Sequence, residues 1–303
     1  METEFIWQNG AFVRWHEATT HVLTHTLHYG GGAFEGVRFY DTSRGPAIFR
    51  LPEHIERLFY SGGVLQMEIP FTPKQFCDAA VELLRRNKLD QGYIRPLVYY
   101  GYGKMGVNPA GAPVDAVIAC WRWGKYLPAE AVDIKVSKYI RIHPRTTVSD
   151  AKLCGHYVNS ILAVQELKGT NYHEALFLDF EGNVAEGPGE NFFIIKNNTV
   201  YTPPLGAILA GITRATVIDL LSHLNIPLVE KTITLEEAFA ADEAFFTGTA
   251  AEVTPIRSID DREIGNGKVG PVSQLVKDTY LDIVNGRREE FHHYLTFVSN
   301  NAR

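Results

Sequence analysis

Apolar and polar residues alternate along the first fifty residues, which is the pattern of half-buried β-strands. Residues 4–10, EFIWQNG, and residues 11–15, AFVRW, predict two strands joined by a tight turn at Asn9-Gly10. Residues 36–51 repeat the pattern, and we place the turn of this second hairpin at residues 43–46. The chain is therefore expected to begin with two β-hairpins.

Two helices are expected next, and each carries a proline near its start. Residues 51–65, LPEHIERLFYSGGVL, place Pro52 in the first turn of a helix, where its missing N–H costs nothing. Residues 71–89 have an amphipathic helical pattern, with Thr72 as the N-cap and Pro73 at the first helical position.

A glycine run follows the next predicted strand, YIRPLVYY at residues 93–100. Gly101, Gly103 and Gly106 spell GxGxxG, which is the nominal dinucleotide-binding fingerprint. That fingerprint needs a helix directly after it, so that the helix N-terminus can hold a pyrophosphate. Here Asn108-Pro109 and a loop come next, so we reject a dinucleotide site. VDAVIACWRW then predicts a buried strand.

Three histidines at residues 21, 25 and 28 have the spacing of metal ligands on one helical face. The interleaved threonine, valine and leucine residues favour extended structure, which would scatter that face. We therefore expect an extended segment and no metal site.

The interdomain connection is placed at residues 125–133, where the pattern changes. A strand is expected directly after it, and a helix over residues 159–168. Residues 174–195, EALFLDFEGNVAEGPGENFFII, predict a hairpin with its turn at residues 181–183, which leads into a Gly-Pro-Gly loop.

Three expectations concern the remaining chain. Thr213 is positioned to be the N-cap of a helix over residues 214–224. A strand over residues 243–256 is interrupted by the small-residue turn Gly248-Thr249-Ala250, whose backbone N–H groups suit an anion. Residues 270–287 predict the last helix, and the tail with His292-His293 is expected to be solvated.

Composition excludes several classes of protein. The chain has 303 residues, of which 45% are hydrophobic and 21% charged, as in soluble globular proteins, and its length suggests two domains. A net charge of −6 and the absence of a basic stripe argue against a nucleic-acid partner. We find neither a signal-peptide core nor an apolar run of membrane-spanning length, so no membrane partner and a cytoplasmic location are expected.

The three cysteines, Cys77, Cys120 and Cys154, are odd in number and far apart. This spacing fits neither a disulfide framework nor a CxxC metal site. We expect reduced thiols.

Eight short motifs occur in an order that indicates one enzyme family. They are HYGGGAFEGVRFY (28–40), EHIERL (53–58), YIRPLVYYG (93–101), MGVNP (105–109), SDAK (149–152), EGPGENFF (186–193), GITR (211–214) and TGTAAEVTPI (247–256). With them the chain resembles the branched-chain amino-acid aminotransferases, which belong to the class IV, pyridoxal-phosphate-dependent transaminases. Any one motif would be weak evidence, whereas the ordered set is specific.

The resemblance implies a fold and a domain division. The fold class is α/β (mixed α+β), in the two-domain form of the class IV aminotransferases. We expect a small α/β domain over residues 1–124, a linker over 125–133 and a large domain over 134–303 that carries the catalytic lysine. The smallest active unit is expected to be a homodimer.

The resemblance also implies the catalytic and cofactor-binding residues. Lys152 matches the lysine that bonds to pyridoxal 5'-phosphate and moves the proton at the substrate Cα. Glu186 matches the acid held against the pyridine nitrogen, and Tyr157 the tyrosine beside the cofactor's phenolic oxygen. The phosphate would be held by Arg57, by the helix N-terminus at Ile212 and Thr213, and by Thr249.

Substrate-binding positions follow from the same match. They are Phe34, Gly36, Arg38, Tyr93, Arg95, Trp123 and Tyr126 for the side chain, Thr249 and Ala250 for the α-carboxylate, and Tyr29, Met105 and Val107 from the neighbouring subunit. Arg95 is the candidate for the second carboxylate of glutamate, which must use the same pocket as leucine. Aromatic and apolar residues in these motifs would otherwise be ordinary core.

Two departures and several alternatives remain. Residues 153–156, Leu-Cys-Gly-His, replace a small glycine-rich run after the lysine, and Ala210 replaces a common proline. D-amino-acid or (R)-amine transaminases and aminodeoxychorismate lyase share the fold, but the set around Phe34 and Arg95 resembles the branched-chain type. A nucleotide-dependent oxidoreductase and a non-enzymatic ligand-binding or assembly protein are alternatives from other classes.

Overall fold

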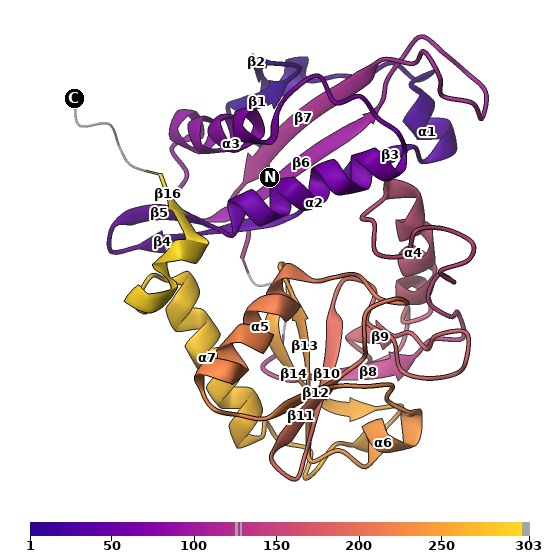
Figure 1. Ribbon diagram of the computed structural model, residues 1–303, viewed down its shortest axis with the longest axis vertical. Coiled ribbons are helices and arrows are strands. Elements are labelled where there is room, and N and C mark those ends of the chain that lie inside the picture. Colours follow the sequence, from indigo (N-terminus) through magenta and orange to yellow (C-terminus); the bar gives the residue numbers. More distant parts are fainter. Residues whose placement is uncertain (125–126, 128, 299–303) are drawn as a thin grey trace. The chain divides into compact units, whose positions relative to one another are not determined.

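The computed structural model of the protein describes residues 1–124, 127 and 129–298. It divides into two compact units (Figure 1). Unit 1 comprises Met1–Gly124, Ala151–His156 and Ile283–Arg303, and unit 2 comprises Lys125–Asp150 and Tyr157–Asp282. Residues 125, 126 and 128 of the predicted interdomain connection lie outside the described residues, so its position stays a prediction.

An eight-stranded sheet, antiparallel at every pairing, forms the centre of unit 1, in the order β16-β5-β4-β6-β7-β1-β2 with β3 paired to β6. Its strands are β1 (Phe5–Gln8), β2 (Ala11–Arg14), β3 (Gly32–Phe34), β4 (Val37–Thr42), β5 (Gly45–Phe49), β6 (Gly92–Tyr100), β7 (Val114–Trp121) and β16 (Leu295–Phe297). Both predicted hairpins are confirmed. Asn9 and Gly10 have the positive φ angles, 48° and 91°, that a two-residue hairpin turn requires.

Helices α2 (Leu51–Val64) and α3 (Pro73–Asn87) pack against each other and against this sheet (Figure 1). Thr72 caps α3 as predicted, because its hydroxyl accepts from the Gln75 N–H at 3.3 Å. The apolar faces of the two helices join the sheet in one core that includes Leu58 and Phe76. As expected, the glycine run after β6 leads into a loop and then β7, with no helix between them.

Two predictions for unit 1 are wrong. Residues expected to be extended form a short helix, α1 (His25–Tyr29), which ends at Gly30 in the left-handed conformation with φ 67°. The tail is not solvated either. A 3₁₀ helix over Glu289–Tyr294 leads into β16, which pairs with β5, and Phe291 is buried. In both places long-range pairing and packing outweigh local propensity.

Unit 2 is built on a second eight-stranded sheet, of mixed parallel and antiparallel pairing, in the order β12-β11-β10-β13-β14-β8-β9 with β15 paired to β14. Its strands are β8 (Val132–Val136), β9 (Glu174–Leu176), β10 (Asn191–Lys196), β11 (Thr199–Thr202), β12 (Leu228–Glu230), β13 (Glu243–Gly248), β14 (Glu252–Ile259) and β15 (Arg262–Glu263). Its helices are α4 (Tyr157–Gln165), α5 (Ile212–His223), α6 (Leu235–Phe239) and α7 (Pro271–Val284), which continues into unit 1 at Ile283.

The predicted hairpin over residues 174–195 is present, but only loosely paired. Leu178 and Val184 form an isolated bridge, and the Phe177 N–H donates to the Glu186 carbonyl at 2.9 Å. The return segment then enters the Gly-Pro-Gly loop without becoming a regular strand until β10. The turn lies where expected, with the Gly182 N–H bonded to the Asp179 carbonyl at 3.2 Å.

A buried carboxylate from strand β13 caps the N-terminus of helix α7. Glu243, on β13, accepts from the backbone N–H groups of Val272 and Ser273 at 3.1 and 2.7 Å. These are two of the donors that every helix start leaves without a partner inside the helix. Among the described residues, no helix is long and apolar enough to cross a membrane, and no three histidine, cysteine or acidic side chains are grouped as metal ligands.

Candidate active site

Lys152 belongs to Ala151–His156, the short segment of unit 1 that comes from the middle of the chain, although the sequence predicts it in the large domain over residues 134–303. Its N–H donates to the Ser61 hydroxyl on α2 at 2.9 Å, and its carbonyl accepts from the Phe34 N–H at 3.1 Å. The amine lies 5.1 Å from the centre of the Phe34 ring. The backbone is thus held on both sides, and only the side chain decides where the amine lies.

The unusual residues after the lysine are accommodated by close packing against Gly30. The Gly155 N–H donates to the Gly30 carbonyl at 3.2 Å, and a Cβ on Gly30 would lie only 2.9 Å from the Gly155 Cα. His156 turns back, with its Nδ1 3.1 Å from the Ala151 carbonyl. Burial raises the pKa of the Cys154 thiol to about 11, so it is a protonated structural residue.

The substrate residues predicted on β3 and β6 gather around the same Phe34 ring. The Arg95 guanidinium lies 4.9 Å from the ring centre of Phe34 and 5.5 Å from that of Tyr93. Tyr93 in turn meets the Trp123 ring edge to face, at 4.4 Å between centres. The Arg95 Nε is buried and has no hydrogen-bond partner among the described residues, as expected of a group that awaits an anion.

Gly36 and Arg38 complete this set on the neighbouring strand. A Cβ on Gly36 would lie 1.7 Å from the Tyr93 hydroxyl, so any residue larger than glycine at position 36 would clash with the Tyr93 side chain. Arg38 is buried, and its Nη2 donates to the Gly124 carbonyl at 2.8 Å. Tyr126, also predicted to bind the substrate, lies outside the described residues.

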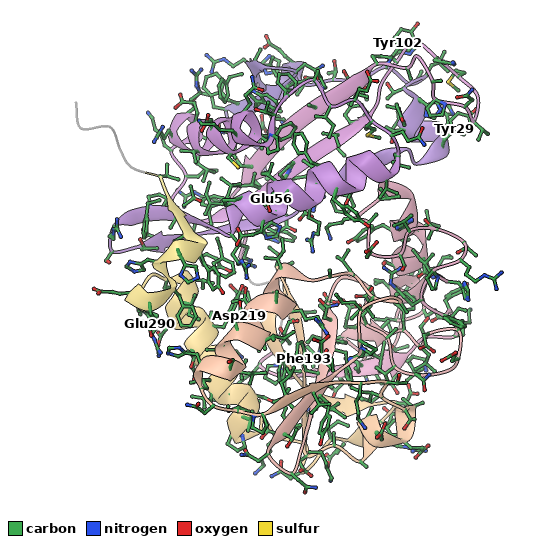
Figure 2. All side chains as sticks on the ribbon, viewed as in Figure 1. Tyr29, Glu56, Tyr102, Phe193, Asp219 and Glu290 are labelled. Carbon is green, nitrogen blue, oxygen red and sulfur yellow. The ribbon has the colours of Figure 1, made fainter. Side chains whose placement is uncertain are left out.

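Tyr29 and the loop after β6 form an exposed corner of unit 1, where Figure 2 labels Tyr29 and Tyr102. The Gly106 N–H donates to the Tyr29 hydroxyl at 3.2 Å, and the Gly106 carbonyl lies 2.8 Å from His25 Nε2. Both sides of this glycine are therefore held by α1. Met105 and Val107 flank it with 43% and 84% of their surface exposed.

Arg57, the predicted phosphate ligand, lies on α2 and is held by Glu35. Its Nε and Nη2 donate to the two Glu35 oxygens at 2.6 and 3.0 Å. Glu35 is fully buried, and a third donor, His54, contacts it at 2.7 Å.

In unit 2, Glu186 is a buried carboxylate with three donors. Arg141 Nε donates to its Oε1 at 2.5 Å, and Asn191 Nδ2 to its Oε2 at 3.0 Å. The Leu209 N–H lies 3.2 and 3.1 Å from the two oxygens. Arg141 supplies the positive charge that a buried carboxylate requires.

The start of helix α5 is tied to the same carboxylate through Asn191. Gly211 is the N-cap, and no side chain caps the helix. The prediction that Thr213 is the N-cap is therefore wrong, because this residue lies inside the first turn. A Cβ on Gly211 would come within 1.9 Å of the Asn191 Oδ1, so this glycine lets the helix start approach the residue that also binds Glu186. Glu186 and the bare N–H groups at Ile212 and Thr213 thus belong to one local structure.

The predicted turn at residues 248–250 ends β13 beside β10. Thr247 pairs with Asn191 across the two strands, so their side chains share one face of the sheet. The Thr247 hydroxyl is buried without a hydrogen-bond partner among the described residues. Thr249 and Ala250 are half-buried in the turn that follows.

Tyr157 is the first residue of α4. This helix is joined to the Gly-Pro-Gly loop, because the Ser160 hydroxyl donates to the Pro188 carbonyl at 2.8 Å.

Sequence reasoning missed four contributors: Ser61, Glu35, His54 and Arg141. Glu35 and His54 lie inside two of the motifs, where their acidic and basic side chains were the available signal. Arg141 and Ser61 lie outside every motif, and only tertiary contacts reveal them.

These two sets of residues suit a phosphorylated pyridine. Unit 1 offers the Lys152 amine and the Arg57 guanidinium. Unit 2 offers the buried Glu186 carboxylate, a helix N-terminus without a side-chain cap and, among the described residues, a buried Thr247 hydroxyl without a hydrogen-bond partner. A phosphate dianion needs N–H and guanidinium donors, and a protonated ring nitrogen needs a carboxylate.

Comparison with known proteins defines the family. The profile described as amino-transferase class IV matches residues 32–259, and the chain belongs to this family. A branched-chain-amino-acid aminotransferase of Pseudomonas aeruginosa is 48% identical over 97% of each chain. Two crystal structures of the T.th. branched-chain amino acid aminotransferase match with TM-scores of 0.96 and 44% identity, over 99% of this chain and 100% of theirs. Within the family, the chain thus groups with the branched-chain enzymes.

Proposed function

We propose that the residues described above form the active site of a branched-chain amino-acid aminotransferase, which exchanges an amino group between L-leucine, L-isoleucine or L-valine and 2-oxoglutarate through pyridoxal 5'-phosphate. The observation that carries this proposal is the 48% identity to a branched-chain enzyme over 97% of the chain. The T.th. relative binds pyridoxamine 5'-phosphate in one structure and N-(5'-phosphopyridoxyl)-L-glutamate in the other. The D-amino-acid and (R)-amine alternatives find no support among these relatives.

Absorbance spectroscopy tests this function directly. The purified protein should be yellow, and L-valine should bleach the colour as the amino group is transferred. A colourless protein that stays colourless when pyridoxal phosphate is added, or a colour that only D-amino acids or (R)-amines bleach, would contradict it.

The cofactor, when bound, supplies an aldehyde that takes up amino groups and a ring that withdraws electrons. In our proposal Lys152 would hold the cofactor by its amine and, once released, would move the proton at the substrate Cα. Glu186 would hold a proton at the ring nitrogen, and Tyr157 would donate to the phenolic oxygen. Arg57, the α5 N-terminus and Thr249 are the residues that would bind the phosphate. Arg141 and Asn191 hold the Glu186 carboxylate, as their contacts of 2.5 and 3.0 Å indicate.

The pocket around Phe34 must accept both a branched apolar side chain and the carboxylate of glutamate. Its aromatic rings suit the first, and Arg95 suits the second. Replacing Arg95 with leucine should weaken the half-reaction with L-glutamate by about 1.5–3 kcal/mol, the worth of a hydrogen bond to a charged group, and spare L-leucine. Single-turnover rates with the two amino acids measure this, and equal losses for both would make Arg95 structural.

The smallest active unit in this proposal is a homodimer, in which Tyr29, Met105 and Val107 reach the neighbour's site. Their exposure, 43%, 43% and 84%, supports a role outside their own subunit. Tyr29 and His25 of α1 contact the N–H and the carbonyl of Gly106, which ties the loop that carries Met105 and Val107 to this helix.

Complementation between two inactive variants tests the shared site. Lys152→Ala and Tyr29→Ala homodimers should each be nearly inactive, whereas mixed dimers place both defects in one site and leave the other intact. Co-expression should restore roughly a quarter of wild-type activity if subunits mix statistically. Mixed dimers, verified by two different affinity tags, that remain inactive would show that Tyr29 and Lys152 serve the same subunit's site.

We further propose a cytoplasmic location. Cys77, Cys120 and Cys154 are free, as predicted, and such thiols are typical of a reducing compartment. Burial raises the pKa of Cys77 to about 11 and that of Cys120 to about 12, so both are unreactive.

A further inference from the structure

The Glu35 carboxylate is buried inside unit 1 with no exposed surface. Its Oε1 accepts from Arg57 Nε at 2.6 Å. Its Oε2 accepts from Arg57 Nη2 at 3.0 Å, from His54 Nδ1 at 2.7 Å and from the Gly36 N–H at 3.3 Å. This bidentate contact orients the whole guanidinium plane.

Protonation states in this cluster follow from its surroundings. Burial by itself would raise the pKa of Glu35, but the Arg57 cation and the His54 hydrogen bond together hold that pKa well below its usual range. Burial lowers the pKa of His54, in spite of the nearby carboxylate. The cluster is therefore a carboxylate, a guanidinium and a neutral imidazole that donates from Nδ1, with no net charge.

The elements around the cluster keep it rigid. His54 and Arg57 are three residues apart on α2, so they face the same direction. The Glu35 N–H donates to the Pro96 carbonyl on β6 at 2.9 Å, which ties the Glu35 backbone to the sheet. Ordering a free arginine side chain costs up to about 2 kcal/mol of rotamer entropy, and this cost would otherwise weaken the binding of an anion. The Arg57 guanidinium is oriented before any anion arrives.

We propose that His54 and Glu35 are positioning residues that hold Arg57 for the phosphate group of the cofactor. The inference rests on the proposed function, in which Arg57 binds that phosphate. His54 acts through Glu35, and Glu35 through Arg57. A purely structural cluster, which only fastens α2 to the segment after β3, would affect folding but would not discriminate between phosphorylated and unphosphorylated ligands.

The test compares two ligands that differ only in the phosphate, pyridoxal 5'-phosphate and pyridoxal, by equilibrium titration of the apoprotein. His54→Leu removes the donor to Glu35 without a change of charge, and His54→Asn keeps an N–H donor. His54→Leu should weaken pyridoxal-phosphate binding by about tenfold, the lower end of the losses known for residues that support metal ligands, and leave pyridoxal binding unchanged. His54→Asn should restore most of the loss.

Two further variants separate the possible outcomes. Glu243→Gln is the matched control, because Glu243 is also a buried carboxylate, but it accepts hydrogen bonds from the N-terminus of α7 and does not contact Arg57. It should lower the melting temperature and leave the affinity ratio of the two ligands as in the wild type. Arg57→Ala should lose phosphate discrimination at least as strongly as His54→Leu. If Arg57→Ala keeps wild-type discrimination, the phosphate role of Arg57 fails, and the inference with it.

Other results address the positioning role alone. If Arg57→Ala loses discrimination while His54→Leu keeps the wild-type ratio, His54 is structural and the inference is overturned, whereas the proposed function stands. Should His54→Leu not fold, Glu35→Gln takes its place. In Glu35→Gln the removal of a negative charge would by itself tighten phosphate binding. Weaker binding of pyridoxal phosphate, with pyridoxal binding unchanged, would therefore show that the positioning of Arg57 is lost. Unchanged or tighter binding would overturn the inference.

Discussion

Replacing Lys152 with alanine should abolish transamination, with a loss of more than about 10³-fold, because the proton carrier and the covalent link to the cofactor both disappear. The fold should persist, since the backbone contacts of Lys152 with Ser61 and Phe34 do not involve its amine. Borohydride reduction of the wild-type holoenzyme, followed by peptide mass spectrometry, should place the cofactor on Lys152. The variant should yield no such adduct.

Lys138→Ala is the matched control for this experiment. Lys138 lies in the same part of the chain, but its side chain is 70% exposed and pairs with Glu166. This variant should keep both the adduct and the activity. An adduct mapped to Lys135, Lys138 or any other lysine would refute the assignment of Lys152.

Replacing Glu186 with glutamine should slow proton removal from the substrate Cα by about 100-fold or more, because the charge that keeps the ring nitrogen protonated is lost. The side-chain shape is retained, so cofactor affinity should change much less. Stopped-flow half-reactions with L-valine deuterated at Cα measure the step directly. An unaltered rate would mean that another group holds the nitrogen.

Glu190→Gln separates charge at the ring nitrogen from charge in the loop. Glu190 is as buried as Glu186, at 4% exposure each, and lies in the same Gly-Pro-Gly loop. Its Oε2 accepts from the Gly189 N–H at 3.0 Å. This variant should show a much smaller loss of rate, because it changes the support of the loop. Equal losses for the two variants would make the effect of Glu186 structural.

Local sequence signals predicted elements well where the signal and the packing agree. The Asn9-Gly10 turn and the Thr72 cap depend on short-range geometry that the residues themselves prefer. The same reasoning failed at His25–Tyr29, at the N-cap of α5 and at the C-terminal tail. At α5, Gly211 rather than Thr213 is the N-cap, and its contact with Asn191 leaves no room for a side chain.

The sequence by itself determined the family, the mixed α/β class and the motif residues, because each motif holds its chemistry within a few consecutive residues. Only the tertiary structure decided how these residues are supported. Arg141 meets Glu186 across 45 positions of sequence, and Ser61 meets Lys152 across 91. Such contacts depend on which strands pair and which helices cover them, and no local sequence pattern predicts this arrangement. The partners of the reactive groups therefore become visible only once the chain is folded.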